Sequence, residues 1–329
     1  MSTASGSRIA IVEAMRGLAA IAVACNHFSL PLSGPLPEAL TVYGWLGVDV
    51  FFVISGFVIP LSLHGRNYRL RDFPNYLLRR LIRLEPPYIA SILFVIVLWH
   101  ASAAAPQYAG SAPDYSLAQI FFHLLYLIPL TNYAWLADIY WSLAYEFVFY
   151  IVVGLTFSLL IDRRSVATLA VIVIICTAFF YLQNRFSLDS QLTVGVMEFG
   201  VGVLLMRLVV DKGWHATAAN HLWLVICLAF VFYDGGTILG MTVLASVCAI
   251  YLLKSLRLGR WAFGSISYSL YLTPESIGGR VLKLGRRWGE GALYEIALIG
   301  MALAGSIAFA IVFAFLIEGP SRRAARRIS

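Results

Sequence analysis

Residues 42–63 read VYGWLGVDVFFVISGFVIPLSL and contain one charged side chain, Asp49. A helix of about 20 mainly apolar residues crosses the roughly 30 Å hydrocarbon core of a bilayer. The apolar residues of this stretch follow one another directly, whereas a membrane β-strand alternates apolar and polar positions. The stretch therefore predicts a transmembrane helix.

The rest of the chain has the same character. Its 329 residues are 60% hydrophobic and 12% charged, with a formal net charge of +7. An average soluble domain carries about 25% charged residues. This difference excludes an ordinary soluble enzyme, a disordered protein and a charge-rich nucleic-acid-binding protein. The four cysteines lie inside apolar runs without metal-ligand spacing, so we expect no metal site.

Apolar runs predict eleven candidate membrane segments: 9–29, 42–63, 86–102, 117–131, 140–161, 166–183, 192–210, 221–234, 237–253, 262–279 and 292–317. Lys and Arg concentrate in cytoplasmic loops, which places 64–84 inside and both 30–44 and 101–116 outside. An odd number of crossings must then separate 101–116 from the inner pair Arg163-Arg164. The short 117–131 segment is therefore expected to lie at the interface or to re-enter.

The expected fold is an all-α, polytopic transmembrane helix bundle of about ten spans with both termini cytoplasmic. A single integral-membrane domain covers residues 1–329, including a short basic tail at 319–329. The basic loop 280–290 departs from the charge rule because the order of spans places it outside, where it could meet an anionic substrate. The loops leave no room for a soluble catalytic domain, so the chemistry is expected inside the bundle or at its two faces.

Ionisable side chains inside spans cost several kcal/mol and are candidates for function. Arg16 and His27 are eleven residues apart and share one face of the first span, with Arg16 toward the cytoplasm. Asp49 and Glu146 fall at an outer depth similar to that of His27. A carboxylate orients an imidazole and stabilises its protonated form, so His27, Asp49 and Glu146 are candidate catalytic residues. Polar contacts between helices are the alternative explanation.

A polar stripe follows the 140–161 span, because Ser142, Glu146 and Tyr150 recur every four residues beside Trp141. Such a stripe is typical of a substrate-binding face or of a structural hydrogen-bond ladder.

An arginine cluster precedes the third span. Arg79 and Arg83 are one helical turn apart and Arg80 lies beside them. Arginine forks suit phosphate groups, such as those of a coenzyme A thioester. The alternative is an ordinary cytoplasmic anchor.

Six separated pieces of the chain carry a resemblance. They are Arg16-Gly17-Leu18 with His27, Gly47-Val48-Asp49 through Ser55-Gly56-Phe57, Arg80-Leu81-Ile82-Arg83, Trp141-Ser142-Leu143 with Glu146 and Phe149-Tyr150, Ser267-Tyr268-Ser269-Leu270-Tyr271-Leu272, and Glu318-Gly319-Pro320. In this order the chain resembles the acyltransferase-3 family of integral-membrane O-acyltransferases over nearly its whole length. The arginine–ten–histidine spacing and the tryptophan–serine–leucine motif are the more specific parts.

The resemblance implies a ten-helix enzyme that takes an acyl group, commonly acetyl from acetyl-CoA, on the cytoplasmic side. The acceptor is a hydroxyl of an extracytoplasmic polysaccharide or lipid-linked sugar, as in bacterial exopolysaccharide or lipopolysaccharide O-acetyltransferases. Such an enzyme is a multi-pass protein of the bacterial cytoplasmic membrane. By position, His27 matches the catalytic histidine, Arg16 its motif partner, and Arg80 with Arg83 the double-arginine motif.

One position departs from the family pattern. After Ser-Tyr-Ser-Leu-Tyr-Leu the family usually has a histidine within two residues, whereas this chain continues with Thr273, Pro274 and Glu275. Glu275 is expected to supply the missing polar function in acceptor binding, together with Trp141, Ser142 and Tyr150.

The sequence therefore predicts transmembrane acyl transfer. The donor's phosphates are expected at Arg79, Arg80 and Arg83 and its pantetheine arm near Arg16, while His27 acts as general base or carries the acyl group itself. Expected partners are membrane lipids, the glycan acceptor and polysaccharide-assembly proteins, with no nucleic acid.

Two other functions remain open from the sequence. A sugar or lipid transporter or flippase also needs buried charges, but it consumes no thioester. A non-catalytic partner in polysaccharide export would not restore acylation on its own in a deletion host.

Overall fold

The computed structural model describes residues 10–28, 38, 41–105, 110–161, 191–210, 214–255 and 262–328. Within these ranges the regular structure is helical, without strands. Five helices of the described chain are long and apolar enough to cross a membrane: Leu46–His64, Leu70–Ala103, Asp138–Ile161, Ala218–Leu253 and Ala292–Arg326. The all-α, membrane-spanning character is thus confirmed, and the number of ten spans stays a prediction. The predicted span 166–183 and the pair Arg163-Arg164 lie outside the described residues, as does most of the predicted outer stretch 30–44.

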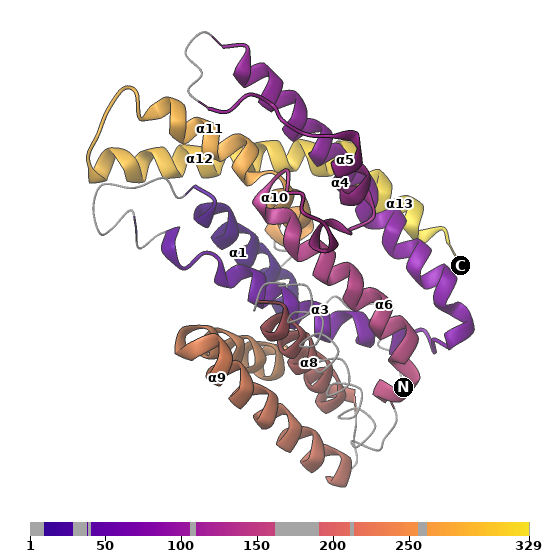
Figure 1. Ribbon diagram of the computed structural model, residues 1–329. Coiled ribbons are helices and arrows are strands. Elements are labelled where there is room, and N and C mark those ends of the chain that lie inside the picture. Colours follow the sequence, from indigo (N-terminus) through magenta and orange to yellow (C-terminus); the bar gives the residue numbers. More distant parts are fainter. Residues whose placement is uncertain are drawn as a thin grey trace. The chain divides into compact units, whose positions relative to one another are not determined.

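The principal helices are α1 (Ala10–Asn26), α3 (Leu46–His64), α4 (Phe73–Ala103), α5 (Leu117–Leu124), α6 (Trp141–Ile161), α8 (Gln191–Val210), α9 (Trp214–Leu253), α10 (Ala262–Leu272), α11 (Pro274–Gly285), α12 (Ala292–Phe313) and α13 (Gly319–Arg326). Figure 1 labels them. The chain divides into two compact units: unit 1 contains Met1–Ala19, Leu46–Leu77 and Tyr145–Ser265, and unit 2 contains Ala20–Trp45, Leu78–Ala144 and Ile266–Ser329.

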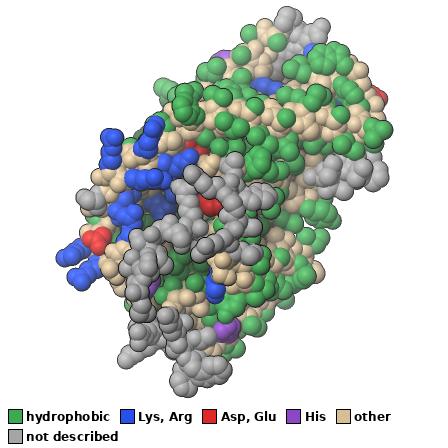
Figure 2. Space-filling model, turned by 180° about the vertical axis from the view of Figure 1, so that it is seen from behind, with side chains coloured by type: hydrophobic (Ala, Val, Ile, Leu, Met, Phe, Trp, Pro, Cys, Tyr) green, Lys and Arg blue, Asp and Glu red, His purple; other side chains and the backbone are tan. Residues whose placement is uncertain are grey.

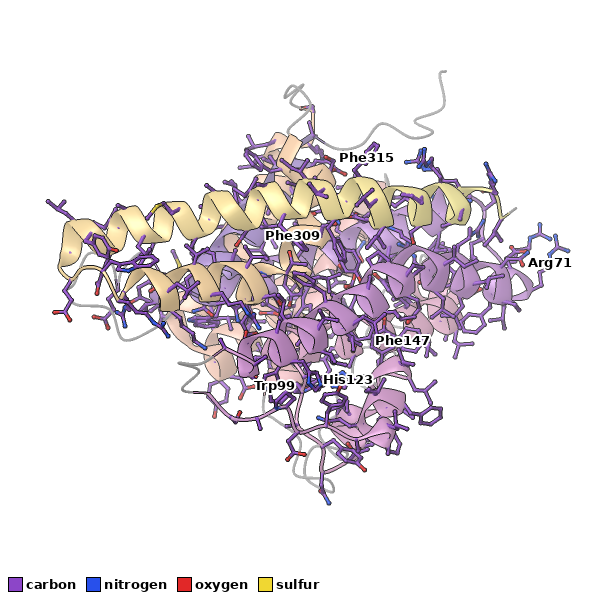
Figure 3. The ribbon with its side chains drawn as sticks, turned by 90° about the horizontal axis from the view of Figure 1, so that it is seen from above. Arg71, Trp99, His123, Phe147, Phe309 and Phe315 are labelled. Carbon is purple, nitrogen blue, oxygen red and sulfur yellow. The ribbon has the colours of Figure 1, made fainter. Side chains whose placement is uncertain are left out.

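Many large apolar side chains are exposed on the outside of these helices, as lipid-facing positions require. Phe315 is 78% exposed and points away from the protein, whereas Phe309 stacks on Phe94 of α4 at 4.6 Å (Figure 3). Figure 2 shows hydrophobic side chains over much of one face and basic side chains gathered in one region of it.

Unit 1 is built on a close contact between α3 and α8. A Cβ atom on Gly56 would lie 2.2 Å from the Phe199 carbonyl oxygen, and one on Gly202 would lie 2.3 Å from that of Val53. Small residues allow helix backbones to approach in this way. Phe52 fills the neighbouring space against the Phe199 ring, at 4.7 Å between centroids. The two helices are therefore locked at a specific register.

The α9 element consists of two helical arms that meet at Gly236, which has φ 80°. Glycine adopts this left-handed conformation without steric cost. The arms correspond to the predicted segments 221–234 and 237–253, and both contribute buried side chains to the core of unit 1.

In unit 2, α11 packs against the beginning of α12, and α13 lies at the far end of α12 (Figure 1). The Tyr294 hydroxyl donates to the Gly285 carbonyl at 2.7 Å, and Arg286 pairs with Glu295 at 3.2 Å. A π-helical turn at Ala314–Glu318 joins α12 to α13. Helical structure therefore continues well past the predicted end of the last segment at residue 317.

Two predicted segments have different boundaries in the structure. The 262–279 segment is broken between α10 and α11, because Pro274 lacks an N–H group and its ring disfavours a helical conformation at the preceding residue. The 117–131 segment contains the eight-residue α5, about 12 Å long and too short to cross a bilayer, followed by a 3-10 turn at Ile128–Leu130.

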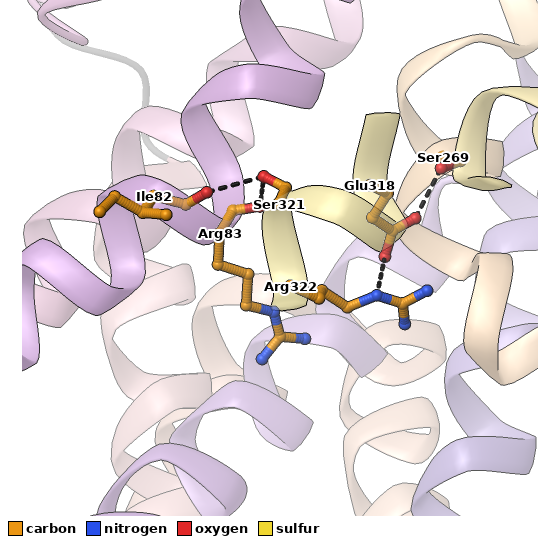
Figure 4. A network of polar contacts seen from close by, with 6 residues as sticks. All are labelled: Ile82, Arg83, Ser269, Glu318, Ser321 and Arg322. Carbon is orange, nitrogen blue, oxygen red and sulfur yellow. Dashed lines mark hydrogen bonds and ion pairs between the residues drawn. The ribbon is translucent and has the colours of Figure 1, made fainter. Parts of the chain in front are cut away.

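The third predicted span, 86–102, begins earlier than expected, since α4 starts at Phe73 and contains Pro86 and Pro87 in its interior. Each proline lacks the N–H that would bond the carbonyl four residues earlier, which leaves those of Ile82 and Arg83 without their usual donors. The Ser321 hydroxyl of α13 donates to both carbonyls, at 2.7 and 3.3 Å (Figure 4). The proline pair is therefore tolerated because another helix satisfies the backbone.

Candidate functional site

His27 lies directly after α1, in unit 2. Its backbone N–H donates to the Val23 carbonyl at 3.1 Å, so the residue continues the last helical turn. The next side chain, Phe28, is buried, and a Cβ atom on Gly278 of α11 would lie 1.9 Å from its ring. This close approach fixes the turn that carries His27 beside the first turns of α11.

A carboxylate lies within electrostatic range of this histidine. Asp138 begins the 3-10 turn Asp138–Tyr140, which leads into α6, and its charge acts on both the His27 imidazole and the Glu275 carboxyl group. Glu275 lies in the first turn of α11, three residues before Gly278. We call these three residues of unit 2, His27, Asp138 and Glu275, the His27 cluster, because Asp138 is within electrostatic range of both His27 and Glu275. Arg280 is also within electrostatic range of Glu275.

Asp138 is the residue of this cluster that sequence reasoning missed. It stands three positions before the Trp141-Ser142-Leu143 motif, in a stretch assigned to the approach to a span. An aspartate next to a specific motif was a detectable signal, but its proximity to His27 depends on tertiary structure.

A buried aromatic and hydroxyl network lies beneath Asp138. Tyr140 is fully buried and donates its hydroxyl hydrogen to Ser91 at 3.0 Å, and Ser91 donates to the Tyr88 carbonyl at 2.7 Å. The Tyr88 and Tyr140 rings meet edge to face at 5.1 Å. This network holds the 3-10 turn against α4.

His123 of α5, labelled in Figure 3, contacts the same network. It is fully buried, its Nε2 accepts from the Leu136 N–H at 3.1 Å, and its Nδ1 lies 3.1 Å from the Tyr88 hydroxyl. A backbone N–H only donates, so the ring is neutral with its proton on Nδ1. Burial lowers the pKa of His123 to about 4. We interpret His123 as a structural histidine.

Ser142, a predicted substrate-binding residue, is buried and bonded to the Tyr271 hydroxyl of α10 and to the Ile139 carbonyl. It therefore connects the 3-10 turn to the Ser-Tyr-Ser-Leu-Tyr-Leu segment. Trp141 is half-buried at the beginning of α6.

Glu146 lies in unit 1, where Ser55 of α3 donates to its Oε1 at 3.2 Å and the Tyr150 hydroxyl donates to the same atom. A substrate-binding role for the stripe of Ser142, Glu146 and Tyr150 stays a prediction. The Glu146–Tyr150 contact forms along the helix, but the serine that reaches Glu146 comes from another helix.

Asp49 is buried in the first turn of α3 and faces Glu198 of α8, which is fully buried. The Glu198 carboxyl oxygens have no geometrically well-formed hydrogen-bond partner among the described residues. Two adjacent carboxylates in an apolar interior cannot both be ionised, so at most one of this pair carries a charge. That Asp49 or Glu146 orients His27 stays a prediction, because the two carboxylates and the imidazole belong to different units.

The predicted donor-binding arginines lie on two helices. Arg16 is half-buried on α1 in unit 1. Arg79, Arg80 and Arg83 are half-buried on α4 in unit 2, and Arg79 donates to the Ile328 carbonyl at 3.5 Å. The α4 group therefore lies together with the C-terminal segment.

The chain was compared with known protein families, and the matched range includes all the predicted catalytic and binding residues. The sequence model of the acyltransferase domain family matches residues 9–315, whereas no curated protein and no solved structure matches the chain. In the part of the chain that the structure describes, no three His, Cys, Asp or Glu side chains are arranged to hold a metal ion. With the matched motifs on membrane-spanning helices, the chain belongs to the acyltransferase-3 family of membrane acyltransferases.

Proposed function

We propose that this acyltransferase moves an acetyl group from cytosolic acetyl-CoA to a hydroxyl of an extracytoplasmic carbohydrate or lipid-linked glycan in the bacterial cytoplasmic membrane. The observation that carries the proposal is the cluster at the end of α1, where the imidazole of His27 has the carboxylate of Asp138 within electrostatic range. An imidazole with a carboxylate neighbour is the arrangement that general-base catalysis uses.

The proposed transfer balances in atoms and protons with the donor, the acceptor hydroxyl and the His27 imidazole. Neutral His27 takes the proton of the acceptor hydroxyl, and the hydroxyl oxygen bonds to the thioester carbonyl carbon. The carbon–sulfur bond breaks and the thiolate takes the proton from the imidazolium, which leaves an ester and free coenzyme A. In a covalent route, the imidazole nitrogen first carries the acyl group and the hydroxyl then attacks it. In either route, Asp138 stabilises the positive charge on the ring.

The remaining predicted residues have binding roles in this proposal. Arg79, Arg80 and Arg83 bind the donor's phosphates. A contact of Arg16 with the pantetheine arm stays a prediction, because Arg16 belongs to the other unit. On the acceptor side, Glu275 belongs to the His27 cluster and supplies a hydrogen-bond acceptor for a sugar hydroxyl. Trp141 and Ser142 complete the proposed acceptor site in unit 2. A contribution from Tyr150 stays a prediction, because Tyr150 belongs to unit 1.

The test is the His27→Ala variant in membranes, with labelled acetyl-CoA and the host's glycans. General-base catalysis contributes about 10²–10⁴-fold, so transfer should fall by about two orders of magnitude or more. His64→Ala is the matched control, because His64 is exposed at the end of α3 and should leave transfer unchanged. Undiminished transfer by His27→Ala at normal expression would overturn the proposed mechanism.

A second measurement separates acyl transfer from transport. Purified protein should release free coenzyme A from acetyl-CoA over many turnovers only when an acceptor is present. Movement of a glycan across vesicles without thioester consumption would contradict the proposal.

A further inference from the structure

Glu85 is an acidic residue of α4 that the proposed mechanism does not use. It stands directly before the pair Pro86-Pro87, in a helix long and apolar enough to cross a membrane. Its carboxyl oxygen Oε1 is buried and has no hydrogen-bond partner among the residues that the structure describes. A buried polar atom without a partner is costly, and an ionisable side chain inside a membrane segment is a candidate for function. This oxygen therefore needs an N–H or O–H donor that the described residues do not supply.

Tyr126, whose hydroxyl interacts with the Glu85 carboxyl group, has an unusual backbone conformation with φ 57°. Its N–H donates to the His123 carbonyl at 3.0 Å. The next N–H, that of Leu127, donates to the Phe122 carbonyl at 2.9 Å, which completes a Schellman motif at the end of α5. Glycine or asparagine usually occupies this left-handed position, because other side chains are strained there. Such strain is typical of sites where function fixes a side chain.

Buried tyrosines connect Glu85 to the His27 cluster. The Tyr126 ring stacks on Tyr88 at 5.2 Å, and the Tyr88 ring meets Tyr140 edge to face at 5.1 Å. Tyr140 is the last residue of the 3-10 turn whose first residue contributes its carboxylate to the His27 cluster. All of these residues belong to unit 2. The carboxyl oxygen without a partner and the His27 cluster are therefore two ends of one set of packed residues.

The order of groups along α4 matches the order of groups in an extended acyl-CoA. Glu85 comes after the predicted phosphate-binding arginines along the helix and before Tyr88, which contacts the turn of the His27 cluster. An acyl-CoA has its phosphates at one end, its thioester at the other, and amide groups in the pantetheine arm between them. Amide N–H groups donate hydrogen bonds to carboxyl oxygens, and these bonds are strongest where the carboxyl group is ionised. The arm therefore offers the donors that Glu85 lacks.

We propose that Glu85 and Tyr126 bind the amide groups of the donor's pantetheine arm and position its thioester at the His27 cluster. This inference rests on the proposed function and adds two contacts between its phosphate site and its reacting groups. Glu85 and Tyr126 are positioning residues, because they hold the arm and take no part in bond making or breaking. They act on the affinity for the arm and leave the affinity for the phosphates unchanged.

The experiment measures equilibrium binding of two probes to the purified full-length protein in neutral-lipid nanodiscs. Acetyl-CoA carries both the phosphates and the arm, whereas adenosine 3′,5′-bisphosphate carries phosphates without the arm. In Glu85→Leu/Tyr126→Phe we expect the Kd for acetyl-CoA to rise about tenfold or more, since a lost hydrogen bond to a charged group corresponds to about a factor of ten. The Kd for adenosine 3′,5′-bisphosphate should stay the same. Arg80→Gln/Arg83→Gln should instead raise both Kd values.

The thermal midpoint of the ligand-free protein separates arm binding from a structural role. Glu85→Leu/Tyr126→Phe removes a buried oxygen without a partner together with the hydroxyl beside it, so the midpoint should stay the same or rise. A structural carboxyl group would lower the midpoint when it is replaced. Glu290→Gln is the matched control, because it neutralises an exposed glutamate and should change neither the midpoint nor the two Kd values.

Tyr126→Phe keeps the ring stacked on Tyr88 and gives a second reading should the double variant fail to fold. It should raise the Kd for acetyl-CoA about two- to tenfold, as expected for one neutral hydrogen bond. An unchanged Kd for acetyl-CoA in these variants overturns the inference. An equal rise for both probes also overturns it, because the residues would then serve the phosphate site or the fold. If the unmodified protein binds no acetyl-CoA at all, it is the proposed function that fails.

Discussion

At the scale of single residues, the proposed catalytic histidine has a charged neighbour that stands outside the recognised motifs. An apolar environment disfavours a charged imidazolium, and a nearby carboxylate compensates for that cost. Asp138 supplies such a charge to His27 and also acts on Glu275. In the proposed mechanism, the chemistry of the family motif therefore depends on a residue that the motif does not include.

Replacing Asp138 by Asn keeps its size and removes its charge. We expect acyl transfer to fall about tenfold or more, because the imidazolium loses its stabilising neighbour. The acid limb of the pH–rate profile should move to lower pH for the same reason. The measurement is initial rate against pH with saturating acetyl-CoA. Asp114→Asn, which changes an exposed loop aspartate, is the control. A wild-type rate and profile in Asp138→Asn would exclude this role.

His123 predicts a pH dependence of stability. Its folded pKa of about 4 lies below the ordinary value of about 6.5, so between these pH values the unfolded chain binds a proton that the folded protein does not. Stability contributed by the neutral ring is therefore complete above pH 6.5 and is lost as the pH falls, by about 2 kcal/mol at pH 5. Thermal midpoints in detergent should decrease over this range. His123→Gln should flatten the slope, whereas a variant of the exposed His64 should retain it; an equal slope in His123→Gln would contradict the assignment.

At the scale of helices, local patterns predicted what forms along one helix and missed what forms between helices. The Glu146–Tyr150 contact follows from a four-residue spacing. Ser55, which also reaches Glu146, is 91 residues away, and no periodicity could indicate it. The bend of α9 at Gly236 was visible in the sequence as a gap between apolar runs. The packing of α13 against α4 had no such signal in the sequence. The proline pair in the sequence indicates that two backbone carbonyls of α4 lack their usual helical donors. That Ser321 of α13 donates to them is visible only in the tertiary structure.

The α3–α8 contact gives a prediction at this scale. Gly202→Ala would place a methyl group 2.3 Å from the Val53 carbonyl oxygen and 2.7 Å from Gly56, so the helices must separate. Overpacking of this kind costs about 1–3 kcal/mol, and the unfolding midpoint should fall accordingly. Gly300→Ala is the matched control on α12, where nothing lies within 4 Å of the added atom. That variant should be neutral or more stable by up to about 1 kcal/mol. Equal midpoints for the two variants would mean that the α3–α8 contact is loose.

At the scale of the whole molecule, the few charged residues of a largely apolar chain determine its predicted membrane topology. Composition and the charge rule were enough to predict an all-helical membrane protein, and the family match agrees with that prediction. The same rule left one exception, the basic stretch 280–290. In the structure this stretch precedes α12, and the Arg286–Glu295 pair joins it to the first turns of that helix. The basic residues of the C-terminal tail lie on α13, at the other end of α12.

The side of the membrane on which the basic stretch 280–290 lies can be tested, because helical structure is continuous from Ala292 to Arg326. At 1.5 Å per residue it is about 50 Å long, more than the roughly 30 Å hydrocarbon core, so its two basic ends must lie on opposite sides if it crosses the membrane. With α13 on the cytoplasmic side, a cysteine at Glu290 should react with a membrane-impermeant thiol reagent in intact cells. A cysteine at Ala324 should react only after permeabilisation, and the unmodified chain provides the background from its own cysteines. The reverse pattern would invert the predicted topology. Labelling of both positions from one side would show that this helix does not span the membrane.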